Sequence, residues 1–143
     1  MRPVGQGENT DFCNMAGTHF DGEIYSPPYL FNDDRAIAPH PTISSLSSNI
    51  DSKGFEVKVG GKLTVDMNND GDTTFSLLRL GSAAHSNNTD QRRVPLANVK
   101  NIKARHVIIL PGDASIVLPG YYYLFAMNKA GTPCIARTVQ VVL

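Results

Sequence analysis

Short apolar stretches rich in Val, Ile, Tyr, Phe and Thr alternate along the chain with clusters of Gly, Pro, Asn and Asp. This pattern is typical of short antiparallel strands joined by turns. The predicted strands are Glu23–Phe31, Pro41–Leu46, Phe55–Val59, Lys62–Met67, Thr73–Leu80, Arg93–Val99, Arg105–Leu110, Tyr121–Asn128 and Cys134–Val142. No stretch shows a sustained helical period. We therefore predict an all-β fold, an immunoglobulin-like antiparallel β-sandwich of about seven or more strands.

Two polar clusters that contain glycine predict tight β-hairpin turns, Gly60-Gly61 and Asn69–Asp72, because glycine reaches positive φ at no steric cost. The second cluster overlaps Asp66–Gly71, which mimics the first half of an EF-hand loop. An EF-hand needs a bidentate Glu at its twelfth position, where this chain has Leu77. A hairpin turn is therefore the preferred interpretation.

The amino-terminal residues differ from the rest. Residues 1–21 are polar and offer few anchors, so we expect an irregular segment there and a single sandwich domain over residues 22–143. Pro27 and Pro28 lie inside the first predicted strand. Neither can donate to a strand ladder, so this strand is expected at an edge or with a bulge.

Composition excludes several classes of function. The chain has 143 residues, with 13 basic and 13 acidic side chains, which gives no electrostatic case for nucleic acid or an anionic membrane surface. No run of ~18 apolar residues could span a bilayer. The start of the chain as written lacks the apolar core of a secretion signal.

The cysteines Cys13 and Cys134 lie near opposite ends of the sequence. They can form a disulfide only if the fold brings the two ends together, and two free thiols are at least as compatible with the sequence. Cys134 falls in an alternating strand pattern, where a buried cysteine acts as a small hydrophobe.

The region Leu77–Leu96 carries the clearest chemical signal. An apolar strand ends at a glycine and is followed by His85, and a dense polar block, Asn87–Arg93, precedes the next apolar run. This order predicts a strand, a loop with the histidine at its tip, and a second strand. Metal ligation needs such a fixed neutral imidazole. The other histidines, His19, His40 and His106, are not spaced as a cluster, and His106 is expected to be a surface or a satisfied core residue.

Separate segments, in the same order, resemble the C-terminal domain of the galactose oxidase and glyoxal oxidase family. The segments are Asp21–Asn32, Gly60–Val65, Leu80–Leu96, Leu118–Asn128, Ala130–Pro133 and the run that starts at Thr138. Together they cover roughly residues 19–143, and Asn88-Thr-Asp-Gln-Arg-Arg93 is the most specific match. The amino-terminal end departs from the family because it keeps one cysteine and no Cys-x-x-Cys spacing.

The resemblance implies an immunoglobulin-like sandwich packed on a kelch-type propeller. A hairpin of that sandwich would enter the propeller channel and present His85 as one ligand of a mononuclear copper. The family's other ligands, two tyrosines and a second histidine, lie outside this chain. The parent would be an extracellular copper-dependent oxidase that converts an alcohol or aldehyde and produces hydrogen peroxide. The isolated chain, with one ligand, is expected to be inactive.

Most of the polar residues beside His85 are expected to brace the loop rather than to contact substrate. An Asp90 carboxylate paired with an arginine would serve that purpose. The alternative for His85 is a loop histidine left in a relative whose copper site has decayed. The bracing residues are Asn88, Asp90, Gln91, Arg92 and Arg93.

A second hypothesis is a free-standing binding module that has lost the oxidase and binds a carbohydrate or a protein through exposed aromatic side chains. Tyr121 and Tyr123 would share one face of their strand and Tyr122 the other. Asn87-Asn-Thr89 fits a glycosylation sequon, which we expect to be unused because a modified tip could not enter a propeller. The candidate aromatic residues are Tyr25, Tyr29, Tyr121, Tyr122 and Tyr123.

Overall fold

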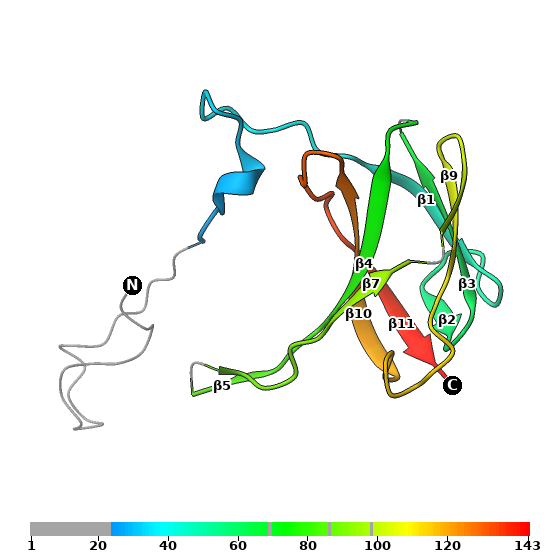
Figure 1. Cartoon of the computed structure of the whole chain (residues 1–143). Helices are drawn as coiled ribbons and strands as arrows, with labels where there is room; N and C mark the ends of the chain where they lie inside the picture. The colour runs from blue at the N-terminus through cyan, green and yellow to red at the C-terminus, as the bar shows by residue number, and fades with distance from the viewer. Residues whose placement is uncertain (1–23, 69, 86, 98) are drawn as a thin grey trace, which may run out of the picture.

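The computed structural model describes residues 24–68, 70–85, 87–97 and 99–143. These residues form two facing sheets and a small two-stranded ribbon that projects away from them (Figure 1). The four-stranded sheet has the order β1 (Ile43–Ser48), β3 (Lys62–Met67), β9 (Arg105–Ile109), β8 (Val99–Ile102). The five-stranded sheet has the order β2 (Glu56–Lys58), β11 (Arg137–Val142), β10 (Gly120–Asn128), β4 (Thr73–Arg79), β7 (Arg93–Leu96). The ribbon consists of β5 (Ala83–Ala84) and β6 (Asn87–Asn88).

Alternating apolar residues of both sheets meet in one core. Leu63 and Val65 point inward from β3, and Leu124 and Val139 point inward from β10 and β11, all of them fully buried. Neighbouring strands in both sheets pair antiparallel, apart from β2, which lies parallel to β11. The predicted all-β sandwich is confirmed.

The three consecutive tyrosines of β10 alternate as predicted. Tyr122 is fully buried and its hydroxyl donates to the Leu118 carbonyl at 2.8 Å. Tyr121 and Tyr123 are exposed on the outer face of the five-stranded sheet. Tyr122 therefore cannot belong to an exposed aromatic binding surface, which corrects its inclusion among the candidate ligand-binding residues.

Both predicted hairpin turns are wrong in one respect. The chain does turn after β2 and after β3, but each turn joins strands of different sheets rather than hydrogen-bonded neighbours. Gly60 has φ 71° and Gly61 N–H donates to the Lys58 carbonyl at 2.8 Å, so the local turn chemistry is as expected. A turn signal fixes where the chain reverses, whereas burial of the flanking residues decides which strand becomes the partner. The same crossing divides the predicted strand Arg93–Val99 between β7 in one sheet and β8 in the other.

The predicted strand Glu23–Phe31 is also wrong. Within its described part the regular element is a 3₁₀ turn, η2 (Pro28–Leu30), in which Leu30 N–H donates to the Pro27 carbonyl. Pro27 and Pro28 cannot donate to a ladder, and their fixed φ favours a turn over a strand. We call residues 24–42 the proline segment. Its far end is bonded to the sandwich, since Nδ1 of His40 lies 2.7 Å from the Pro133 carbonyl oxygen.

Residues 1–21, for which an irregular segment was expected, lie outside the described residues, as do Cys13 and His19. Cys134 is a buried free thiol, and its sulfur accepts a hydrogen bond from Ala126 N–H. Burial raises the pKa of this thiol. In the described ranges we find no helix with both the length and the apolar character to cross a membrane.

His106 is a polar side chain inside the apolar core. It is 1% exposed, and its ring lies 5.1 Å from that of Phe75. Nδ1 lies 2.8 Å from Asn101 Oδ1, while Nε2 has no hydrogen-bond partner among the described residues. Burial lowers the pKa of His106, because the charged imidazolium is poorly solvated there.

Candidate metal-binding arm

The sequence between β4 and β7 forms a narrow arm, residues 80–91, that extends from the five-stranded sheet (Figure 1). Its strands pair in register, Ala83 with Asn88 and Ala84 with Asn87. Every described residue of the arm is exposed apart from Asp90, which is half-buried. The arm therefore has no hydrophobic core of its own.

His85 lies at the far end of this arm. Because Ala84 pairs with Asn87, His85 occupies the first central position of a two-residue hairpin turn. Its φ is 53°, the left-handed region that the primed hairpin turns require and that histidine enters more readily than most residues. The side chain is exposed. The described residues contain no group of three or more His, Cys, Asp or Glu side chains that could hold a metal ion.

Polar side chains hold the two strands of the arm together. Thr89 N–H donates to the Ser82 carbonyl at 2.9 Å, and the two hydroxyls of these residues lie 3.0 Å apart. Asn88 Oδ1 accepts a hydrogen bond from Asp90 N–H at 3.1 Å. The same amide lies over Gly81, where any Cβ would collide with it. A residue with a Cβ at position 81 would therefore force the Asn88 amide to move aside.

At the root of the arm, Arg79 makes contacts with several partners. Its Nε donates to Asp90 Oδ2 at 2.7 Å, and its Nη1 donates to the Pro119 carbonyl at 3.3 Å. Hydrogen bonding to Asp90 and Tyr122 raises the pKa of Arg79. Sequence reasoning expected an arginine partner for Asp90 but did not single out Arg79. The signal in the sequence is its position, since Arg79 is the last residue of β4 and comes two residues before Gly81.

The remaining predicted residues differ in their contacts. Arg92 donates from Nη1 to the carbonyls of Ser115 at 2.8 Å and Ile116 at 3.2 Å. Gln91 is exposed, and so is Arg93, which starts β7 opposite Leu78 of β4. Tyr25 and Tyr29 are exposed on the proline segment, well away from β10 in the sequence.

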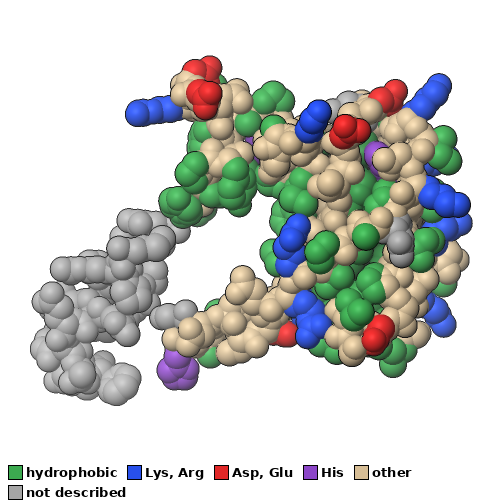
Figure 2. All heavy atoms as spheres, in the orientation of Figure 1, with side chains coloured by type: hydrophobic (Ala, Val, Ile, Leu, Met, Phe, Trp, Pro, Cys, Tyr) green, Lys and Arg blue, Asp and Glu red, His purple; other side chains and the backbone are tan. Residues whose placement is uncertain are grey.

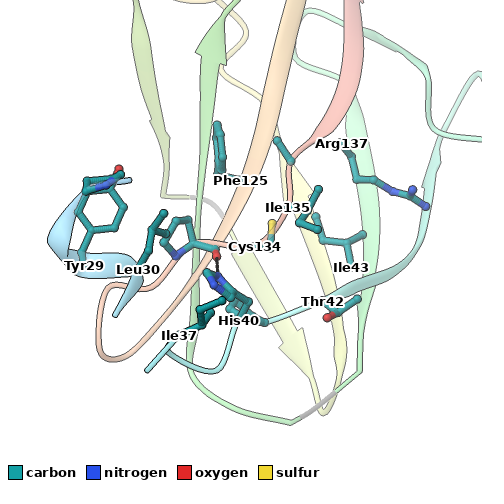
Figure 3. A pocket seen from close by; sticks show the side chains of 14 residues that line it. Tyr29, Leu30, Ile37, His40, Thr42, Ile43, Phe125, Cys134, Ile135 and Arg137 are labelled. Carbon is teal, nitrogen blue, oxygen red and sulfur yellow. Dashed lines mark hydrogen bonds between the residues drawn. The ribbon is translucent and has the colours of Figure 1, made fainter. Parts of the chain in front are cut away.

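An apolar cavity of about 780 Å³ lies between the proline segment and the sandwich (Figure 3). Its walls include Tyr29, Ile37, Ile43, Phe125 and Ile135. Phe125 continues the outward row of β10 toward Tyr123, with ring centroids 6.4 Å apart. We call Tyr121, Tyr123 and Phe125 the aromatic row. It runs from the arm root, where Leu80 N–H donates to the Tyr121 carbonyl, to the cavity.

The described residues thus form a two-sheet β-sandwich with an extended hairpin between β4 and β7 that carries a histidine near its tip. The family model described as "Galactose oxidase-like, Early set domain" matches residues 40–141. The chain belongs to this family.

Similar proteins agree with that assignment. A galactose oxidase of Gibberella zeae is 41% identical over 123 residues, which are 86% of this chain and 17% of that protein. The aldehyde oxidase GLOX of Vitis pseudoreticulata is 34% identical over 125 residues, 84% of this chain and 23% of that protein. The structure of a fungal alcohol oxidase of the AA5 family in complex with copper has a TM-score of 0.80 at 40% identity, covering 92% of this chain and 26% of that one. The chain thus spans between 17% and 26% of the length of these relatives.

Proposed function

We propose that this chain is the accessory domain of a larger copper-dependent oxidase, in which it packs on a kelch-type propeller and donates His85 as one copper ligand. The observation that carries the proposal is the exposed imidazole at the tip of an arm that has no core of its own. The match to a minor part of several oxidases supports it.

The donor set of the chain limits what it can do alone. Imidazole suits copper, but a single neutral imidazole gives one coordination position and weak binding. The described residues supply no cluster of further ligands near the arm. Copper, when bound, would provide the redox chemistry of the parent enzyme. His85 would fix one side of the metal, and the isolated chain would be inactive.

Exposed apolar side chains support packing against a second domain. Ile135 is 89% exposed and Ile37 71% exposed, and both line the apolar cavity. The arm and the proline segment project from the same side of the sandwich (Figure 2). A partner that received the tip of the arm would also cover the aromatic row. Such a contiguous apolar area is unusual on a surface that faces only water.

The parent enzyme would oxidise an alcohol or an aldehyde and reduce oxygen to hydrogen peroxide outside the cell. This substrate class is what the relatives' names indicate for those proteins.

The test is a chimera in which this chain replaces the matching quarter of the copper-bound fungal alcohol oxidase. We expect the chimera to bind copper tightly and His85→Asn to lose that binding, because asparagine tolerates the φ of this turn but is a poor copper ligand. Copper is measured by titration and electron paramagnetic resonance. Tight binding by the 143-residue chain alone, or unchanged binding after His85→Asn, would contradict the proposal.

A free-standing binding module remains the second candidate. The observation in its favour is the aromatic row, in which Tyr121 is 48% and Tyr123 41% exposed, with Phe55 6.2 Å from Tyr121. Exposed aromatic faces can stack on a sugar ring or pack against a protein. Binding on a glycan array that is lost in Tyr121→Ala and survives His85→Asn would favour this candidate over the first.

Glycosylation offers an independent way to separate the two candidates. Asn87 is exposed and lies in a sequon two residues after His85. In a eukaryotic secretory host, the chimera should leave Asn87 unmodified because the partner domain covers the tip as it folds. A glycan at Asn87 in an otherwise folded chimera, detected by mass spectrometry of the peptide, would show that the arm is not seated.

A further inference from the structure

We propose that Arg79 and Arg92 are positioning residues that clamp the root of the arm onto the loop between β9 and β10 and thereby set the direction in which His85 points. This inference rests on the proposed role of His85 as a ligand. It concerns how the arm is aimed, which the family assignment does not address.

The first argument is that the arm cannot aim itself. Beyond the sheet, the arm has pairing and hydrogen bonds between its own strands, but none of its described side chains is buried. An isolated two-stranded hairpin is marginally stable at best in water. The contacts that fix its angle to the sandwich must therefore lie at the root.

The second argument is the set of bonds made by Arg79. The guanidinium bridges Asp90 on the returning strand and the Pro119 carbonyl on the β9–β10 loop. It also lies 3.4 Å from the hydroxyl of buried Tyr122, with its Cζ 5.8 Å from the ring centre. Gly120 leaves room for this approach, because a Cβ there would lie 3.3 Å from Arg79 Nη2. One side chain thus joins both strands of the arm to the sandwich.

The third argument is that Arg92, on the returning side of the arm, hydrogen-bonds to the same β9–β10 loop. It donates to the carbonyls of Ser115 and Ile116, while its own carbonyl accepts a hydrogen bond from Arg79 N–H at 2.9 Å. The loop is a firm support, since Val117 is fully buried and its N–H donates to the Asp113 carbonyl. The two arginines are therefore paired through the backbone and anchored at separate points.

A small rotation at the root of the arm produces a large displacement of His85 at its tip, which matters for a metal ligand. From residue 80 to residue 85 an extended strand covers about 17 Å, so a rotation of about 10° at the root moves the tip by about 3 Å. Metal–ligand distances tolerate deviations of only about 0.2 Å. Loss of the clamp would then cost copper binding even though neither arginine is near the tip.

The direct test uses the 143-residue chain and needs no copper. Residual dipolar couplings of the arm amides should fit the same alignment as the sandwich in the unmodified chain, and should shrink toward zero in the double variant Arg79→Gln, Arg92→Gln. Arg93→Gln is the control, because it removes one positive charge from the residue next to Arg92 and leaves both clamp residues in place. Arm couplings that keep their full size in the double variant, with the sandwich folded, would overturn the proposal.

The second test uses the chimera with the copper-bound fungal oxidase. We expect the double variant to bind copper about tenfold to a hundredfold more weakly, the usual range for residues that orient a metal ligand. Using Arg79→Lys in place of Arg79→Gln should recover little of the lost copper binding, because lysine lacks the planar guanidinium group that reaches two partners at once. Arg93→Gln should bind copper like the unmodified chimera.

The two proposals fail in different ways. If His85→Asn leaves copper binding unchanged, the ligand role fails while the dipolar couplings can still support the clamp. If His85→Asn abolishes binding and the double variant binds normally, the clamp fails and the ligand role stands.

Discussion

The sandwich and the arm are built by opposite means from neighbouring parts of one chain. In the sandwich, β4 places Phe75 and Leu77 in a core shared by both sheets. A few residues later the same strand enters the arm, where each described residue except half-buried Asp90 is exposed. Burial holds the first region together, and hydrogen bonds with the Arg79–Asp90 ion pair hold the second.

This difference has a consequence for what each region can specify. Apolar burial contributes most of the stability but is not directional. A hydrogen bond contributes only about 0.5–1.5 kcal/mol net, yet it constrains distance and angle. An arm braced by polar contacts can therefore be well aimed while adding little to the stability of the whole domain.

The largest expected difference between the two regions is in the free energy of unfolding when a leucine in each is replaced by alanine. Leu77 is 0% exposed and Leu80 is 36% exposed. Leu77→Ala should lower the free energy of unfolding by about 2–5 kcal/mol through loss of burial and a residual cavity, whereas Leu80→Ala should change it by less than about 0.5 kcal/mol. Urea unfolding followed by circular dichroism measures both. Equal losses would mean that the arm root belongs to the core.

The next effect is the pH dependence of stability that arises from His106, the histidine buried in the apolar core. The folded-state pKa of His106 lies below its ordinary value of 6.5, so below about pH 6.5 the unfolded state binds more protons and the free energy of unfolding falls as the pH falls. Asp66 on β3 opposes this change, and its pKa of about 2, set by Arg105 and Ser45, keeps it charged across that range. His106→Leu should flatten the dependence between pH 7 and 5.

The unmodified chain is the reference for this measurement. Urea midpoints at each pH give the comparison. A His106→Leu chain whose stability still falls on acidification would assign the effect to another group.

A smaller and more local effect should follow Gly81→Ala. The new methyl group would displace the Asn88 amide and break its bond to Asp90 N–H. We expect faster hydrogen exchange at Ala83 and Ala84, equivalent to about 1 kcal/mol of local stability, with the urea midpoint unchanged. Gly112→Ala is the matched control, because a Cβ there meets nothing within 4 Å. If the midpoint drops as well, the arm unfolds together with the sandwich.

The smallest effect should come from His85→Asn in the isolated chain. Asparagine also adopts the left-handed conformation, so exchange in the arm should change by less than about 0.5 kcal/mol. Hydrogen exchange on the arm amides measures this. Substantial melting of the arm would mean that the imidazole supports the turn instead of being displayed by it.

Much of the fold could be predicted because strand formation depends on local patterns. The alternation over Lys62–Met67 and over Tyr121–Asn128 predicted strands that the structure contains, but it did not show that the Tyr122 face of the second strand is the buried one. The partners of those strands could not be predicted. A glycine turn such as Gly60-Gly61 has the same sequence pattern whether it joins two strands of one sheet or strands of two different sheets. Pro27 and Pro28 indicated that a regular strand over Glu23–Phe31 was unfavourable, and the prediction gave this too little weight.

The sequence by itself determined that this chain forms a β-sandwich and that His85 lies among polar residues between two strands, because side-chain alternation and turn chemistry act over a few neighbouring residues. Only the tertiary structure decided that Arg79 is the partner of Asp90 and that Arg92 reaches Ser115, 23 residues away. Those bonds join segments that burial of the core first brings together. The direction of the arm is therefore a property of the packed domain.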